Sequence, residues 1–238
     1  MGNNYTNKFS NIKDRFFPNG YPDEMIAIIE PKVENVVRKI ETRFPIDEIK
    51  TMLDVGSFTG IESVMFTDRL PNVFIHTFEP NPESLLNVLK CTKDIPRIKV
   101  HELAMSNFNG ESTFYVTHEN IGASSLLVPF DIEKTGPVSE EIRVNVKTIE
   151  SWAGENEINS IDAIWMDVQG SELNVLIGMG ELLKTVKAIY VESATIPYYN
   201  GASHKDDVIN YLATFDLELI EVDHHDDHEA DYLFLKKI

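Results

Sequence analysis

The chain of 238 residues contains a single cysteine, Cys91, so no disulfide can form within it. Basic residues are also scarce: 21 Lys and Arg stand against 39 Asp and Glu, which gives a formal net charge of −18. This excess of negative charge repels polyanions, which argues against nucleic acids and anionic membranes as partners. No apolar run approaches the roughly 18 residues of a membrane-spanning helix, and no secretory signal precedes the first polar residues. These absences predict a cytoplasmic protein and leave its oligomeric state open.

Hydrophobic residues make up 42% of the chain and charged residues 25%, a balance typical of compact domains. Strand-like apolar runs alternate with amphipathic helical segments, which predicts an α/β fold built on a mostly parallel sheet with helices on both faces. The expected parallel strands are residues 51–55, 73–78, 98–103, 161–168 and 188–192. We expect residues 1–48 to form a helical segment, with its helix at 25–40, that packs on or caps a main domain at 49–238.

Two other regions depart from this alternation. Residues 110–147 contain two segments with the period of partly exposed strands, which predicts an insertion of β structure. The chain closes with strands at 217–222 and 231–235, joined by the acidic, histidine-rich loop 223–229. Its His and Asp residues are of the types that bind metals, but flexible loops rarely hold metal ligands in place. We therefore interpret this loop as a solvated surface, away from the cofactor end of the sheet.

Polar residues follow the predicted strands at the sheet edge where α/β proteins bind ligands. A glycine loop, residues 54–60, comes at the end of the first strand. Glu79 ends the second strand, roughly twenty residues beyond Gly60, which is the sequence separation at which an acidic residue can bind both hydroxyls of a ribose. A dinucleotide needs the Gly-x-Gly-x-x-Gly spacing, but only Gly56 and Gly60 are present, with Phe58 between them. S-adenosylmethionine has no pyrophosphate, and Asp54 can meet its ammonium group, so this cofactor is favoured.

Five ordered blocks of the sequence resemble the FkbM family of S-adenosylmethionine-dependent methyltransferases, over about residues 50–238. The blocks are Leu53-Asp54-Val55-Gly56-Ser57-Phe58-Thr59-Gly60, Phe78-Glu79-Pro80-Asn81-Pro82, Ala104-Met105-Ser106, Gly122-Ala123-Ser124-Ser125-Leu126 and Met166-Asp167-Val168-Gln169-Gly170-Ser171-Glu172. The chain departs from the family pattern at Phe58, where Asn is usual, and at Gln169, where Glu is usual. Gln cannot act as a carboxylate base.

The resemblance implies a class I methyltransferase (Rossmann-like) fold, in which a seven-stranded sheet has an antiparallel last strand. It also implies O-methylation of a sugar, glycan or glycosylated natural product, so the partner is a small-molecule or glycan acceptor. The residues expected to bind the cofactor are Asp54, Gly56, Ser57, Phe58, Gly60, Glu79, Pro80, Ala104 and Ser106.

Methyl transfer to a hydroxyl needs an oxygen held in line with the methyl group and a group that removes the proton. Asp167, after the fourth strand, is the first candidate for this base, and Glu192, ending the fifth strand, is the second. If both face one cavity they can also hold Mg²⁺, although we assign no residue to a metal. His118, in the insertion, is a third candidate base.

Two other functions fit part of the pattern. The departures at Phe58 and Gln169 are compatible with a non-catalytic module that binds the cofactor or a protein. An NAD-dependent dehydrogenase is disfavoured by the missing glycine. For an enzyme, the surplus of acidic residues favours a neutral or cationic acceptor, and an uncharged sugar fits this.

Overall fold

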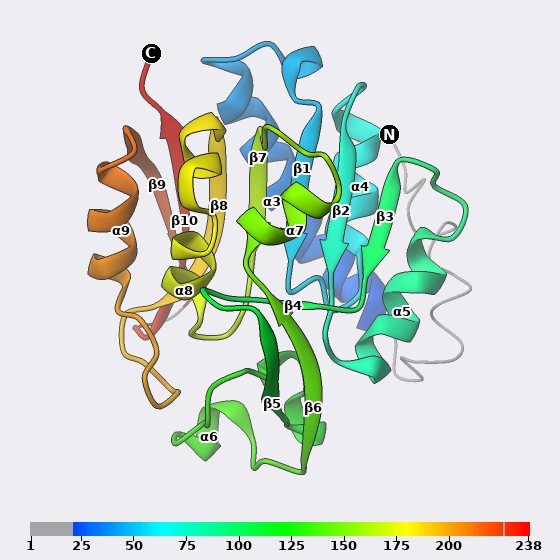
Figure 1. The fold of residues 1–238 in the computed structure, drawn as a ribbon, viewed down its shortest axis with the longest axis vertical. Helices are drawn as coiled ribbons and strands as arrows, with labels where there is room; N and C mark the ends of the chain where they lie inside the picture. Colours follow the sequence, from blue (N-terminus) through cyan, green and yellow to red (C-terminus); the bar gives the residue numbers. More distant parts are fainter. Residues whose placement is uncertain (1–20, 226) are drawn as a thin grey trace.

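A seven-stranded sheet forms the centre of the protein in the computed structural model, which describes residues 21–225 and 227–238 (Figure 1). The strand order is β3-β2-β1-β7-β8-β10-β9, and only β10 runs antiparallel to its neighbours. The strands are β1 (Thr51–Val55), β2 (Phe74–Phe78), β3 (Ile98–His101), β7 (Ala163–Met166), β8 (Ala188–Ala194), β9 (Leu217–His224) and β10 (Glu229–Lys236). The expected class I methyltransferase fold is confirmed.

Helices cover both faces of this sheet, because alternate residues of each buried strand point to opposite sides. On one face, α3 (Tyr21–Glu41) and α4 (Ile61–Arg69) pack over side chains such as Trp165, and α5 (Pro82–Thr92) lies beside α4. On the other face, α7 (Ile149–Glu155), α8 (Glu172–Ile177) and α9 (Lys205–Ala213) enclose Met166 and Phe234. None of the described helices is long and apolar enough to span a bilayer.

The predicted insertion is a small second sheet beyond the carboxyl ends of the parallel strands (Figure 1). In it, β6 (Glu140–Lys147) pairs antiparallel with β5 (Gly110–Val116) and parallel with the short β4 (Ala104–Met105). The short helices η2 (His118–Ala123) and α6 (Ile132–Thr135) lie between β5 and β6. This sheet therefore forms a wall opposite the sheet edge where a ligand is expected.

Several predicted boundaries differ from the structure, and three of these differences lie in the elements around β3 and β7. The strand expected at 98–103 ends at His101, because the chain then crosses to the second sheet. The strand expected at 161–168 pairs only over Ala163–Met166. The helix expected at 172–183 stops at Ile177, and η3 (Gly180–Thr185) follows it. Gly178, between them, leaves room for the carbonyl oxygen of Ser106, which would lie 2.1 Å from an added Cβ.

The interpretation of the histidine-rich loop as a remote surface was wrong. Because β10 is antiparallel, the β9–β10 hairpin turns at the same edge of the sheet as the carboxyl end of β8. The backbone N–H of Thr195, just after β8, donates to the carbonyl of His228 at 2.6 Å. The loop therefore borders the expected site.

The N-terminal segment is described from residue 21 onward, and the rest of the predicted segment, residues 1–20, lies outside the described residues. Helix α3 is longer than the predicted 25–40 and buries Ile29, Val33 and Ile40 against the domain. The boundary at residue 48 remains a prediction.

Candidate cofactor and acceptor site

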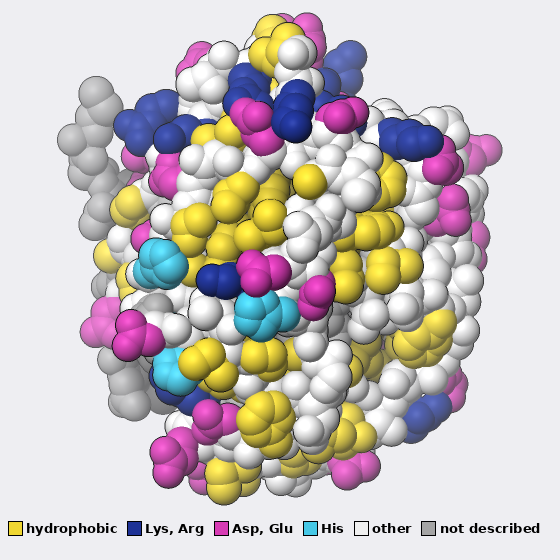
Figure 2. Space-filling model, turned by 90° about the vertical axis from the view of Figure 1, so that its left-hand side faces the viewer, with side chains coloured by type: hydrophobic (Ala, Val, Ile, Leu, Met, Phe, Trp, Pro, Cys, Tyr) yellow, Lys and Arg dark blue, Asp and Glu magenta, His cyan; other side chains and the backbone are white. Residues whose placement is uncertain are grey.

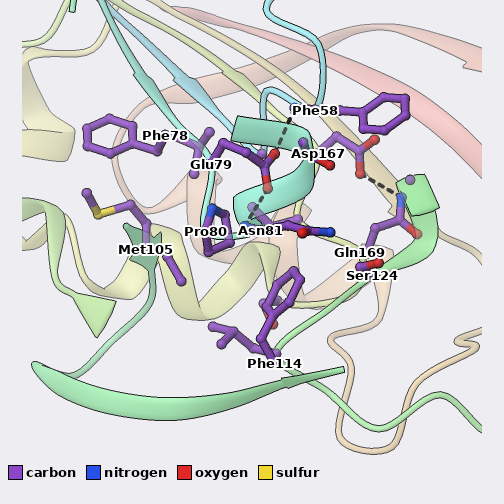
Figure 3. Close-up of a pocket in the computed structure, with 18 of the residues that line it drawn as sticks. Phe58, Phe78, Glu79, Pro80, Asn81, Met105, Phe114, Ser124, Asp167 and Gln169 are labelled. Atoms are coloured by element: carbon purple, nitrogen blue, oxygen red, sulfur yellow. Dashed lines mark hydrogen bonds between the residues drawn. The ribbon is translucent and has the colours of Figure 1, made fainter. Parts of the chain in front are cut away.

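A cavity lies at the carboxyl ends of β1, β2 and β7, under the second sheet, and its lining is mostly apolar at one end with polar groups at the other. Apolar walls with a few placed polar groups are typical of small-molecule sites. We call it the first cavity. Figure 3 shows Phe78 and Met105 at one end of it and Asp167 and Gln169 at the other. The apolar end is suited to a flat aromatic ring, and the polar end to charged groups.

The glycine loop between β1 and α4 forms one wall of the first cavity. Gly56 has a φ of +81°, and an added Cβ would lie 1.7 Å from the carbonyl oxygen of Asp167, so only glycine fits there. Phe58 also adopts the left-handed region, with a φ of +49°. The left-handed backbone and the absence of a side chain at Gly56 therefore let the loop lie directly against the end of β7.

Glu79 fixes this loop from the end of β2. Its Oε2 accepts a hydrogen bond from the backbone N–H of Phe58 at 2.9 Å, and its Oε1 accepts one from that of Asn81 at 2.8 Å (Figure 3). Burial raises the pKa of Glu79 to about 7, against the lowering effect of these two hydrogen bonds. Each oxygen keeps a second lone pair, so the carboxylate can still accept from a ribose hydroxyl.

The structure brings five of the nine expected cofactor residues to the first cavity, namely Gly56, Phe58, Glu79, Pro80 and Ala104. Asp54, Ser57, Gly60 and Ser106 are not among its lining residues. Gly60 is the N-cap of α4, and Ser106 is buried at the edge of the second sheet.

Asp54 faces away from the cavity, although it was expected to meet the cofactor's ammonium group. Its Oδ2 accepts hydrogen bonds from the hydroxyls of Ser63 at 2.5 Å and Thr77 at 3.3 Å. Side chains alternate along β1, so Val55 lines the cavity and Asp54 points to the α4 face. Asp54 is therefore not placed to contact the ammonium group directly.

A second cavity adjoins the first and shares Gly122, Asp167 and Gln169 with it. Its lining is mostly polar: Asn120, Gly122, Ala123, Lys134, Thr135, Asp167, Gln169, Glu192, Tyr198, Tyr199 and Glu229. Asp167 and Glu192, the two leading candidates for the base, are thus brought together. Asp167 lies at the junction of the two cavities, and Glu192 lies only in the second.

Gln169 bridges these two carboxylates. Its Nε2 donates to Asp167 Oδ1 at 2.7 Å and lies 3.1 Å from Glu192 Oε1. The two ionised carboxylates can only accept, so they require the NH₂ end of the amide, and Gln169 Oε1 lies on the other side, 2.7 Å from the hydroxyl of Tyr199. A Glu at this position would place a third carboxylate beside the other two, and the neutral amide of Gln169 avoids that repulsion.

Desolvation makes these acids unusually basic. Burial raises the pKa of Asp167 to about 6, and repulsion from Asp231 adds to this against the hydrogen bond from Gln169. Burial and then repulsion from Asp167, Glu229 and Asp231 hold the pKa of Glu192 well above its ordinary range. Perturbed carboxyl groups in a cavity are typical of functional sites.

Mg²⁺, considered for Asp167 and Glu192 on condition that both face one cavity, does not fit this arrangement. The space between Asp167 and Glu192 is taken by the Gln169 amide, which donates hydrogen bonds and cannot bind a cation through its nitrogen. We therefore derive no step through a metal at this pair.

His118 lies apart from the other candidate bases. Its imidazole is half exposed, with Nδ1 3.6 Å from Glu83 Oε2 and Nε2 3.9 Å from Glu140 Oε2, and it lines neither cavity. The structure thus does not support His118 as the base.

Asp231, Glu229 and Lys32 are near the site but were not found from the sequence. Asp231 is a buried acid within the apolar strand β10, and its carboxylate lies beside Lys32 of α3. An acid inside an apolar strand is a signal that could have identified it, because buried charges are rare unless paired.

Comparisons with known proteins identify a family that this chain matches. A model described as "Methyltransferase FkbM domain" matches residues 54–233. The 2-O-methyltransferase NoeI of Sinorhizobium fredii is 27% identical over 179 residues, which cover 70% of this chain and 72% of that protein. The hexuronic acid methyltransferase AglP of Haloferax volcanii is 27% identical over 149 residues, 61% of this chain and 56% of that protein.

Among solved structures, the magnesium protoporphyrin IX methyltransferase ChlM of Synechocystis is similar with a TM-score of 0.51. The sequence identity is 7%, and the match covers 99% of this chain and 100% of that one. At this identity the likeness shows a shared fold.

Proposed function

Because the chain belongs to the FkbM family of S-adenosylmethionine-dependent methyltransferases, we propose that it methylates a hydroxyl group of a neutral sugar or glycan. The observation that carries this proposal is the position of Asp167 at the junction of the two cavities. The first cavity would hold S-adenosylmethionine, and the second the acceptor.

The residues of the first cavity fit the cofactor in four ways. Phe78, Met105 and Phe114 offer an apolar pocket for adenine, and Glu79 offers lone pairs to ribose. Asn81 Nδ2 and Ser171 Oγ are buried lining atoms without a hydrogen-bond partner among the described residues, which leaves them available to a ligand. Asp167 supplies negative charge, which favours a cationic cofactor.

When bound, S-adenosylmethionine supplies an activated methyl group on a sulfonium. In the proposed reaction, Asp167 accepts the acceptor's O–H proton while the new O–C bond forms and the S–C bond breaks, leaving S-adenosylhomocysteine. Glu192 accepts a hydrogen bond from the acceptor, and Gln169 keeps the two carboxylates apart.

The charge of the second cavity supports a neutral acceptor. Its described lining includes Asp167, Glu192 and Glu229 against one basic residue, Lys134. Sugar hydroxyls can donate to these carboxylates, whereas an anionic sugar is repelled. The similar NoeI is a 2-O-methyltransferase, which agrees with an oxygen acceptor. AglP is named for a hexuronic acid, and the acidic lining of the second cavity is the reason we propose a neutral acceptor for this chain instead.

We expect neutral glycosides to be methylated at least about tenfold more efficiently than the matching uronic acids, because the carboxylate would face the acidic side chains of the second cavity. The measurement is formation of S-adenosylhomocysteine with paired substrates, such as a methyl glucoside and the corresponding methyl glucuronide, over a panel of sugars. Equal or better turnover of the uronic acids would refute the neutral-acceptor proposal.

Binding of S-adenosylmethionine should release protons near pH 6.5. The cofactor carries a net positive charge, which lowers the raised pKa values of Asp167 (about 6) and Glu79 (about 7), so partly protonated carboxyl groups ionise on binding. The affinity should therefore rise as pH increases from 5.5 to 7.5. Calorimetry in buffers with different ionisation enthalpies measures the released protons.

S-adenosylhomocysteine provides the matched control for this experiment, since it lacks the sulfonium charge and should show a weaker pH dependence. Net proton uptake with S-adenosylmethionine, or the same pH dependence for both ligands, would contradict this electrostatic account.

A further inference from the structure

Lys32, His225 and Asp231 form a charged cluster behind Glu192, which we call the Lys32 cluster. The ammonium of Lys32 lies 2.5 Å from Asp231 Oδ2 and 2.9 Å from His225 Nε2. His225 Nε2 lies 2.7 Å from the same Asp231 oxygen. Figure 2 shows histidine, lysine and acidic side chains adjoining in the middle of one face. The cluster joins helix α3, the β9–β10 hairpin and strand β10, which are far apart in the sequence.

Asp231 is the ionised centre of this cluster. Burial alone would raise its pKa, but hydrogen bonds from His225, Lys32 and Tyr190, together with the charge of Lys32, hold that pKa below its ordinary value. The hydrogen bond to Asp231 in turn raises the pKa of His225, against the effect of burial. One carboxylate therefore faces two groups that carry positive charge when His225 is protonated.

The cluster reaches the second cavity through His225. Its other ring nitrogen, Nδ1, lies 3.6 Å from Glu192 Oε2, whereas the bridging amide of Gln169 contacts Glu192 Oε1. Glu192 thus lies among three repelling acids, Asp167, Glu229 and Asp231, and the charge of Lys32 offsets part of their effect on its pKa. A protonated His225 beside Glu192 Oε2 adds to this offset, and without these positive charges the buried carboxyl group would hold its proton more strongly.

A metal ion is the alternative that this geometry suggests, since Glu192, His225 and Asp231 each offer a ligand atom and these atoms lie within 4.8 Å of one another. The ammonium of Lys32, however, already lies against Asp231 and His225 where such an ion would bind. A divalent ion would have to displace a positive charge. Lys32 is therefore the cation of this cluster.

We propose that Lys32 and His225, held in place by Asp231, offset part of the negative charge around Glu192 so that it can accept a hydrogen bond from the acceptor, which makes α3 part of the acceptor site. This inference rests on the proposed function. His225 and Lys32 are positioning residues here, because they act through Glu192.

The proposal predicts how pH affects acceptor binding. The charged and titratable groups around His225 are Lys32 on α3, Glu192 and Tyr190 on β8, Asp223 on β9, Glu229 and Asp231 on β10, and Asp167 after β7. Removing the imidazolium raises the pKa of Glu192 further, so more of it is protonated at pH 7. Acceptor binding that is weakened in this way should recover as pH rises, because Glu192 then ionises even without the neighbouring positive charge.

The variants His225→Gln and Lys32→Gln test this. Each should raise the KM for the acceptor about tenfold at pH 7, with kcat and cofactor affinity changed by less than about threefold, and the KM should approach the wild-type value near pH 9. Lys32→Arg should restore most of the loss. In the wild type, the NMR signal of the His225 ring should titrate above the ordinary value for histidine, about 6.5.

Two matched controls separate this role from a structural one. His224→Gln changes the neighbouring exposed histidine, and Lys39→Gln breaks another ion pair between α3 and the sheet, Lys39 with Glu221 at 2.6 Å. Both should keep the wild-type KM and pH profile. If the cluster variants behave like these controls, the inference is overturned while the proposed function stands. If the wild type methylates no sugar although it binds the cofactor, the proposed function itself fails, and the inference fails with it.

Discussion

Replacing Asp167 with Asn is expected to lower kcat by about a thousandfold, which is within the usual effect of removing a general base. The substitution keeps the shape of the side chain but removes the oxygen that can take the acceptor's proton. Affinity for S-adenosylmethionine should fall by less than about tenfold, because the apolar pocket, Glu79 and the glycine loop are unchanged. Turnover assays and calorimetry on the same preparation measure the two effects separately.

Asp162→Asn is the matched control, since Asp162 and Asp167 flank the two ends of β7. Asp162 Oδ2 accepts from the backbone N–H groups of Lys50 and Thr51, and its Oδ1 pairs with Lys187 at 2.9 Å, so its role is to hold the start of the sheet. This variant should lose thermal stability but keep its kcat. Wild-type turnover in Asp167→Asn would remove Asp167 from the reaction.

Replacing Gly56 with Ala should abolish cofactor binding and destabilise the fold by about 3 kcal/mol or more. Two effects add at this position: the φ of +81° is strained for any side chain, and the new Cβ would overlap the carbonyl oxygen of Asp167. The glycine loop or the end of β7 would have to move. Thermal unfolding and calorimetry with S-adenosylmethionine measure both consequences.

Gly201→Ala separates the two effects, because Gly201 has a φ of +80° but nothing within 4 Å of an added Cβ. It should show only the backbone cost, about 1 kcal/mol, and retain cofactor binding. If both alanine variants were equally stable and bound the cofactor equally well, the close approach of the loop to Asp167 would not matter for the site.

The sheet and the insertion could be predicted because they follow from local patterns. Apolar runs, strand alternation and the glycine loop fixed the positions of β1, β2, β5, β6 and β8 to within a few residues. Asp167 and Glu192 were found because carboxyl ends of neighbouring parallel strands meet at one edge, and the structure places both in the second cavity.

The rest depends on side-chain direction and on contacts between distant residues. Asp54 lies near the end of the expected strand 51–55 but faces α4, which the loop pattern alone did not indicate. Lys32 and Asp231 meet across 199 positions of sequence, and only the antiparallel pairing of β10 brings the histidine-rich hairpin to the site. His118 has the right chemistry, but the second sheet holds it at an exposed edge beside Glu83 and Glu140.

The most direct test of the account follows the methyl group itself. Wild-type protein and Asp167→Asn are each incubated with S-adenosylmethionine carrying a ¹³C-labelled methyl group and with the best neutral glycoside, and carbon NMR locates the label. We predict that the wild type transfers the label to a sugar oxygen, with one S-adenosylhomocysteine formed per O-methyl group, and that Asp167→Asn binds the cofactor but leaves the label on it. Label on a nitrogen or carbon, or equal transfer by both proteins, would contradict the account.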